Sequence, residues 1–80
     1  VVSQVVAEVA VVTGVLTTEI RGKSRVAPIA RARHFAWFKL VGMGLSASEV
    51  ARAFSVDHTT VLHGVDKIKS QLGHQKMRAA

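Results

Sequence analysis

The stretch from Asp57 to Leu72 constrains the fold most, because a helix-capping residue is followed by apolar residues that recur at regular intervals. An Asp suits a helix N-terminus, where its carboxylate accepts from backbone amides. The apolar residues recur at helical spacing and can face a core: Val61, Leu62, Val65, Ile68 and Leu72. The other side carries polar residues: His58, Thr59, His63, Asp66 and Lys67. We predict a helix that ends near Leu72, with Gly73 as its C-cap.

The polar tip of this helix suits the reading of DNA bases. A helix that enters the major groove is anchored by one face, and its first turns must approach base edges closely. Asp57, His58 and Thr59 place short hydrogen-bonding groups at that end. In an ordinary helix the same residues would only be solvated. The neighbouring segments must therefore show whether this helix binds DNA.

The N-terminal segment is rich in valine. These residues follow a helical period and predict a core helix over residues 2–12, ended by Thr13-Gly14: Val2, Val5, Val6, Val9 and Val12. A strand is the alternative, because Val is β-branched, but the spacing favours a helix. The segment is too short to span a bilayer and lacks the order of a signal peptide. A second, short helix is expected over residues 16–20.

Pro28 suits the first turn of a longer helix that follows a loop at 21–27 and runs to about Met43. One stripe of that helix is apolar: Ile29, Ala32, Ala36, Leu40 and Met43. Aromatic side chains are expected in the core, with stacking on unpaired bases as the minor alternative. They are Phe35, Trp37, Phe38 and Phe54.

The segment from Ala47 to Gly64 predicts two helices joined by a tight turn. Ser46 and Glu49 form a capping box, in which each side chain accepts from the other residue's amide. The short helix that follows has inward residues Val50, Ala51 and Phe54, with the small Ala51 at the helix crossing. Ser55-Val56 makes the turn, where many helix-turn-helix proteins have Gly. Plain packing of a helical hairpin is the alternative to DNA binding.

The chain is strongly basic. Eleven Lys and Arg against five Asp and Glu give a net charge of +6. Five of these cations and no acid lie in residues 21–33: Arg21, Lys23, Arg25, Arg31 and Arg33. Such a segment predicts a partner rich in phosphate, although a solvated loop would have the same composition.

Length and composition argue against catalysis. Eighty residues make a single domain, which we place at residues 1–73 with a disordered tail at 74–80. The absence of Cys excludes thiolate metal sites, and His58 and His63 are five residues apart, so they do not share a helical face for zinc. No nucleophile motif or Gly-rich phosphate loop is present. We therefore expect no enzyme activity, no cofactor and no small-molecule substrate.

Residues 57–63 (D-H-T-T-V-L-H), followed by Lys67-Ile68, resemble the signature of the C-terminal DNA-binding domain, domain IV, of the bacterial replication initiator DnaA. The family pattern is G-G-R-D-H-T-T-V-[LI]-H-A followed by a K-I pair. Residues 45–50 (L-S-A-S-E-V) are similar to its L-S-L-P-E-I, and residues 31–34 (R-A-R-H) to its R-P-R-Q. Residues 5–8 (V-V-A-E) resemble the start of its first helix. The resemblance extends over roughly residues 5–72.

This resemblance implies an all-α, Trp-repressor-like helix-turn-helix that binds an A·T-rich box as double-stranded DNA. Asp57, His58 and Thr59 would contact bases in the major groove, and Arg31 would enter the neighbouring minor groove. Thr60 and the amides at Ser46 and Ala47 would bind phosphates. The charge of the basic segment adds further expected phosphate contacts: Lys23, Arg25 and Arg33.

Three departures separate this chain from the family pattern. Gly-Gly-Arg is shortened to Ser55-Val56, and the Pro between the two Arg residues is Ala32. The Ala after the second His is Gly64, which costs the helix about 1 kcal/mol. The departures bear on the DNA sequence that is preferred more than on DNA binding itself.

We expect a cytoplasmic, nucleoid-associated protein that acts in replication initiation or transcriptional regulation. It would be either the end of a full initiator or a stand-alone protein that reuses that end. The alternative is a protein-interaction module, whose basic face docks an acidic partner, a regulatory protein or acidic phospholipid.

Overall fold

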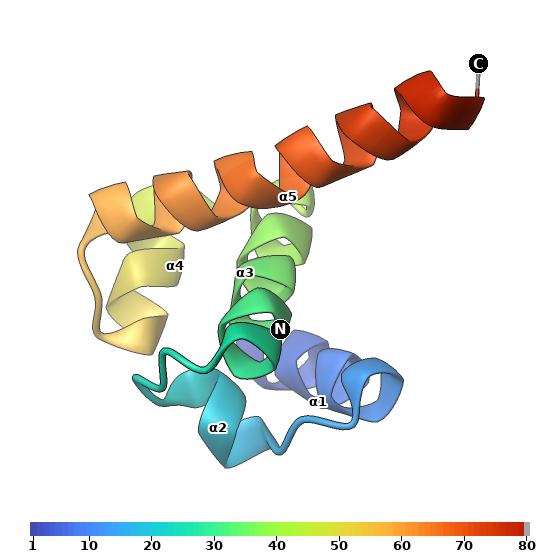
Figure 1. The fold of residues 1–80 in the computed structure, drawn as a ribbon. Helices are drawn as coiled ribbons and strands as arrows, with labels where there is room; N and C mark the ends of the chain where they lie inside the picture. Colours follow the sequence, from blue (N-terminus) through green and yellow to red (C-terminus); the bar gives the residue numbers. More distant parts are fainter. Residues whose placement is uncertain (80) are drawn as a thin grey trace.

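The structure, a computed structural model, describes the backbone of residues 1–79 and the side chains of residues 1–72. Within that range it contains helices and no strands, and the helices are α1 (Val2–Thr13), α2 (Thr17–Arg21), α3 (Ala27–Gly42), α4 (Ala47–Phe54) and α5 (His58–Ala79). Helix α3 is central and contacts each of the other four helices (Figure 1). The all-α fold predicted from the sequence is confirmed. No helix in residues 1–79 is long and apolar enough to cross a membrane.

The helix boundaries in the first half of the chain have local causes. Gly14 adopts the left-handed conformation (φ 76°), and its amide donates to the Ala10 carbonyl at 2.8 Å. This C-cap ends α1 where Thr13-Gly14 predicted. Pro28 lies in the first turn of α3, where its missing amide proton leaves no helical bond unmade.

One core joins all five helices. Trp37 is its largest fully buried side chain, and its ring meets Phe54 edge-on, with centroids 5.9 Å apart. The predicted core positions of Trp37, Phe54, Val50 and Ala51 are confirmed. The full set of buried apolar residues is Val5, Val6, Val9, Ile20, Ala32, Ala36, Trp37, Leu40, Val50, Ala51, Phe54, Val61, Val65 and Ile68.

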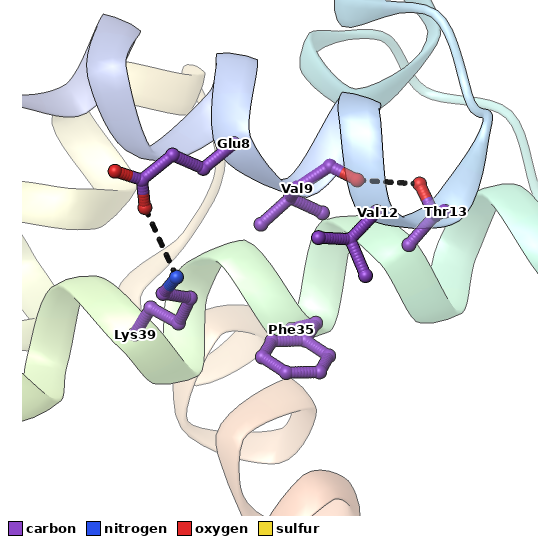
Figure 2. Close-up of a pocket in the computed structure, with 6 residues that line it drawn as sticks. All are labelled: Glu8, Val9, Val12, Thr13, Phe35 and Lys39. Atoms are coloured by element: carbon purple, nitrogen blue, oxygen red, sulfur yellow. Dashed lines mark hydrogen bonds and ion pairs between the residues drawn. The ribbon is translucent and has the colours of Figure 1, made fainter.

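Five residues predicted to face the core are exposed instead: Val12, Phe35, Met43, Leu62 and Leu72. The buried apolar side chains in the described part of α5 are those at 61, 65 and 68, and Leu62 lies about 100° around the helix from Val61. Val12, which is 80% exposed, and Phe35 lie at the edge of the α1–α3 contact (Figure 2). They line a small pocket of about 40 Å³, whose rim carries the Glu8–Lys39 ion pair at 3.1 Å. A cavity of that size holds little more than a water molecule.

Helix α5 also continues past its predicted end. It runs to Ala79, so Gly73 does not cap it. The side chains of residues 73–80 lie outside the described part of the chain, so the predicted disordered tail over 74–80 stays a prediction.

Gly64 lets α5 approach α3 closely. A Cβ atom at this position would lie 2.7 Å from Trp37 Cε3 and 2.8 Å from His34 Cδ2, well inside van der Waals contact. Trp37 is buried and has no room to withdraw. The glycine that departs from the family pattern is therefore required by the packing of this chain.

We expect Gly64→Ala to lower the free energy of unfolding by about 1–3 kcal/mol, because overpacking outweighs the higher helix propensity of Ala. Urea denaturation followed by circular dichroism measures this change. Gly42→Ala is the matched control, since a Cβ there meets no atom within 4 Å and the variant should be neutral or slightly more stable. A Gly64→Ala variant as stable as the wild type would contradict the steric explanation.

Candidate nucleic-acid interface

The capping box at the start of α4 forms as predicted. Ser46 Oγ accepts from the Glu49 amide at 3.1 Å, and Glu49 Oε1 accepts from the Ser46 amide at 2.9 Å. Hydrogen bonds to the Glu49 carboxylate from the Ser46 backbone amide, above all, and from the Ser46 side chain lower the pKa of Glu49. They occupy the Ser46 amide, so an anion at this helix end would be bound by the Ala47 amide instead.

The turn between α4 and α5 is held by its backbone conformation and by Lys23. Ser55 is left-handed (φ 56°, ψ 45°), a conformation that favours Gly and explains why many helix-turn-helix proteins have Gly at the turn. The Val56 amide donates to the Ala51 carbonyl at 3.0 Å, and Lys23 Nζ donates to the Ser55 carbonyl at 2.5 Å. The basic loop is thus tied to the turn that presents α5.

The polar residues at the tip of α5 are exposed and adjacent. Asp57 caps the helix as predicted, since its Oδ1 accepts from the Thr59 amide at 3.0 Å. That bond is the main reason why the pKa of Asp57 is lowered. His58 Nδ1 lies 3.3 Å from the same carboxylate oxygen. Asp57, His58, Thr59 and Thr60 all face solvent, so the tip that the sequence singled out is accessible.

Arg33 requires a correction, because its guanidinium serves the fold. It is 7% exposed and donates to three backbone carbonyls: Nε to Ile20 at 2.8 Å, Nη1 to Ser24 at 2.9 Å and Nη2 to Glu19 at 3.0 Å. Burial lowers its pKa. A nearly buried guanidinium whose three nitrogens all donate to backbone carbonyls is poorly placed to bind a DNA phosphate, so the assignment of Arg33 as a phosphate contact is withdrawn.

The sequence carried a signal for this structural role. Arg33, Ala36, Trp37 and Leu40 are spaced i, i+3, i+4 and i+7, which is the spacing of a buried helix face. All four are buried in α3. Arg31 lies two residues earlier, on the opposite side of the helix, and is exposed.

Four exposed cations, together with the nearly buried Arg33, line a groove between the 22–25 loop, α3 and α5. Its larger part, of about 430 Å³, has Lys23, Arg25, His34 and Lys67 among its lining residues. The adjoining part, of about 290 Å³, shares Arg25, His34 and Lys67 and adds Arg31. No carboxylate lines either part. We refer to the two parts together as the basic groove.

The sequence analysis assigned no role to His34 or Lys67. Lys67 was placed on the polar side of α5 and in the Lys67-Ile68 pair of the signature, and His34 in the segment similar to R-P-R-Q. Their place in the basic groove depends on how α5 crosses α3, which no local pattern shows. Thr60 also lines the groove and connects it to the tip of α5.

The family model of the bacterial DnaA helix-turn-helix matches residues 2–68 of this chain. The chain belongs to the DnaA helix-turn-helix family. Chromosomal replication initiator protein DnaA of Leptospira biflexa serovar Patoc (strain Patoc 1 / Ames) is 34% identical over 61 residues, which are 75% of this chain and 14% of that protein. The same protein of strain Patoc 1 / ATCC 23582 / Paris matches with the same figures. The matched region is thus a small part of these relatives.

The DnaA signature coincides with the most accessible part of the helix-turn-helix. Its Asp57, His58 and Thr59 form the exposed tip of α5, and its Val61 is fully buried against the core. In the described part of the chain, no three His, Asp or Glu side chains gather where they could hold a metal ion. The polar groups that the DnaA fold presents here are suited to hydrogen bonding and to neutralising phosphate charge.

Arg33→Ala should lower the free energy of unfolding by at least about 2 kcal/mol, because three carbonyls lose a charged donor near the end of α2. Thermal and urea unfolding measure the loss. Arg31→Ala removes the same charge from an exposed site on the same helix and should leave stability within about 0.5 kcal/mol. Equal stability of the two variants would show that the Arg33 hydrogen bonds contribute nothing.

Proposed function

We propose that this chain binds duplex DNA sequence-specifically, with the tip of α5 in the major groove and the basic groove against the sugar-phosphate backbone. The observation that supports this most is the exposed DnaA signature at the N-terminus of α5, next to a groove lined by four exposed cations and no carboxylate. Short polar side chains can reach base edges, and the cations can neutralise the adjacent phosphates.

The base contacts are proposed for Asp57, His58 and Thr59. One carboxylate oxygen of Asp57 is bound to the Thr59 amide, which leaves the other to accept from a cytosine amino group. His58 can donate to a base acceptor, and the Thr59 methyl group can contact a thymine methyl. Since the Asp57 cap fixes the first turn of the helix, these groups are oriented before DNA arrives.

Phosphate contacts are proposed for Thr60, Lys23 and Arg25 around the groove, and for the Ala47 amide at the start of α4. Arg31 is exposed on α3 at the outer part of the groove, from which a long side chain can enter a minor groove. A narrow A·T-rich minor groove has an enhanced negative potential that attracts Arg, which supports a preference for an A·T-rich box.

The biological role that we propose is replication initiation or transcriptional regulation, at the nucleoid. The relatives named above are chromosomal replication initiators, and the range matched by the family model includes the tip of α5. An acidic protein or an acidic phospholipid surface would use the same basic groove. Neither of these would require the Asp57–Thr59 tip, so the two classes of partner can be separated by mutation.

The division between base and phosphate contacts makes the first test. His58→Ala should weaken binding to a preferred duplex, selected from a random pool, by about tenfold or more and hardly affect a random duplex. Arg25→Ala should weaken both by a similar factor, because a phosphate contact carries no sequence information. Fluorescence anisotropy measures the dissociation constants.

Lys39→Ala is the matched control for lost charge. Lys39 pairs with Glu8 at the contact between α1 and α3 and lines neither part of the basic groove, so its loss should change binding less than twofold. Tighter binding of acidic phospholipid vesicles than of duplex, unaffected by His58→Ala, would contradict the proposal.

Salt dependence tests the groove as a whole. Four exposed cations line it: Lys23, Arg25, Arg31 and Lys67. If each neutralises one phosphate, the logarithm of the association constant should fall with the logarithm of salt concentration with a slope of about −3.6. Titrations between about 50 and 300 mM salt measure that slope. A slope near zero would be inconsistent with backbone binding in the groove, whereas Arg31→Ala should reduce it by about one.

A further inference from the structure

We propose that His34 belongs to the DNA phosphate site of the basic groove and takes up a proton when DNA binds, so that DNA affinity increases as the pH falls. The inference rests on the proposed function and adds to it a residue and a form of regulation. His34 lines both parts of the groove, together with Arg25 and Lys67.

The imidazole is held in place from two sides. Its ring lies 5.3 Å from the ring of Trp37, with a tilt of 41° between them, and Trp37 is buried. On the other side, Gly64 brings the α5 backbone so close that a Cβ there would lie 2.8 Å from His34 Cδ2. A half-buried ring fixed between two helices cannot move far from the groove, so it must respond to the charge of whatever occupies the groove.

The groups that face His34 in the free protein are cationic. The loop contributes Lys23 and Arg25, α3 contributes Arg31 and Arg33, and α5 contributes Lys67. The remaining neighbours from the turn and from α5, Val56 and Thr60, are uncharged, and no carboxylate lines the groove. Burial, followed by the charges of Lys67 and Arg33, lowers the pKa of His34 below 6.5. The imidazole is therefore neutral near pH 7 when the groove is empty.

A bound phosphodiester reverses this balance. Its negative charge next to the ring favours the imidazolium, whose N–H can donate to a phosphate oxygen. By linkage, DNA that raises the proton affinity of His34 must bind more tightly to the protonated protein. Affinity is greatest below the pKa of the free protein and falls as the pH rises towards the pKa of the complex. Above that second value it is constant.

The pattern that this chain resembles supplies a conservative variant. His34 stands where R-P-R-Q has Gln, which can hydrogen bond to a phosphate but cannot take up a proton at these pH values. Each unit by which DNA raises the pKa of His34 corresponds to a tenfold change in affinity across the window. His34→Gln should remove that change and leave the affinity above pH 8 nearly as it is.

The first experiment measures the dissociation constant of a random duplex from pH 5.5 to 8.5 at constant ionic strength, in a buffer without phosphate. The wild type should bind about tenfold more tightly at the acid end. His34→Gln should flatten this dependence, while His63→Gln, on the exposed side of α5, should retain it. If His34→Gln keeps the wild-type slope, this inference fails alone; if the wild type binds no duplex at any pH, the proposed function fails with it.

The second experiment measures the wild-type protein and uses a variant only to assign a signal. Carbon-edited NMR of the His34 ring, assigned by the signal lost in His34→Gln, follows its titration in the free and DNA-bound protein. We expect duplex DNA to raise the titration midpoint by about one pH unit, and an unchanged midpoint would overturn the proposal. Inorganic phosphate at the same concentration of phosphate groups should leave it unchanged, and an equal rise would assign the groove to free anions instead of DNA.

Discussion

The close approach of α5 to α3 at Gly64 determines how α5 is positioned in the helix-turn-helix. Trp37 packs under this glycine and meets Phe54 of α4 edge-on, so one aromatic ring is in contact with both helices of the helix-turn-helix. Since both helices rest on the same buried side chain, the angle between them is fixed by the core and not by the turn alone. The exposed tip of α5 can therefore remain polar and contribute little to stability, because Val61 and Val65 hold the helix from its other side.

The basic segment shows why net charge overstates the charge that is available to a partner. Arg33 satisfies three carbonyls in the interior, and Arg21 lies 5.6 Å from the centre of the Phe54 ring, whereas Lys23 holds the turn but remains exposed. A guanidinium buried in this way stabilises the end of a short helix that has little core of its own. Arg25 and Arg31 stay exposed, and α5 adds Lys67 to them. The tertiary fold thus brings the exposed cations of residues 23–31 together with Lys67 in the basic groove.

Features that depend on neighbouring residues could be predicted from the sequence. The Ser46–Glu49 box, the Asp57 cap and the Gly14 helix end all form as expected, because each is made within a few residues. The exposed Val12 and Leu62 and the buried Arg33 could not be assigned from apolar character alone, since burial depends on where a second helix crosses. The helical spacing of Arg33 with Ala36 and Leu40 would have revealed its burial if charge had been set aside.

Two departures from the DnaA pattern turn out to be neighbours in space. Gly64 replaces an Ala and His34 replaces a Gln, and a Cβ at position 64 would lie within 3 Å of both His34 and Trp37. A helix-propensity loss of about 1 kcal/mol at position 64 is thus offset by closer packing of the two rings against α5. The ring of His34 also lines the basic groove. Gly64, which allows the closer packing, therefore also sets the position of a titratable group at the proposed DNA surface. The packing of the interior and the chemistry of the groove are therefore not independent. Gly64 and His34 should be changed together when the Ala and Gln of the DnaA pattern are introduced.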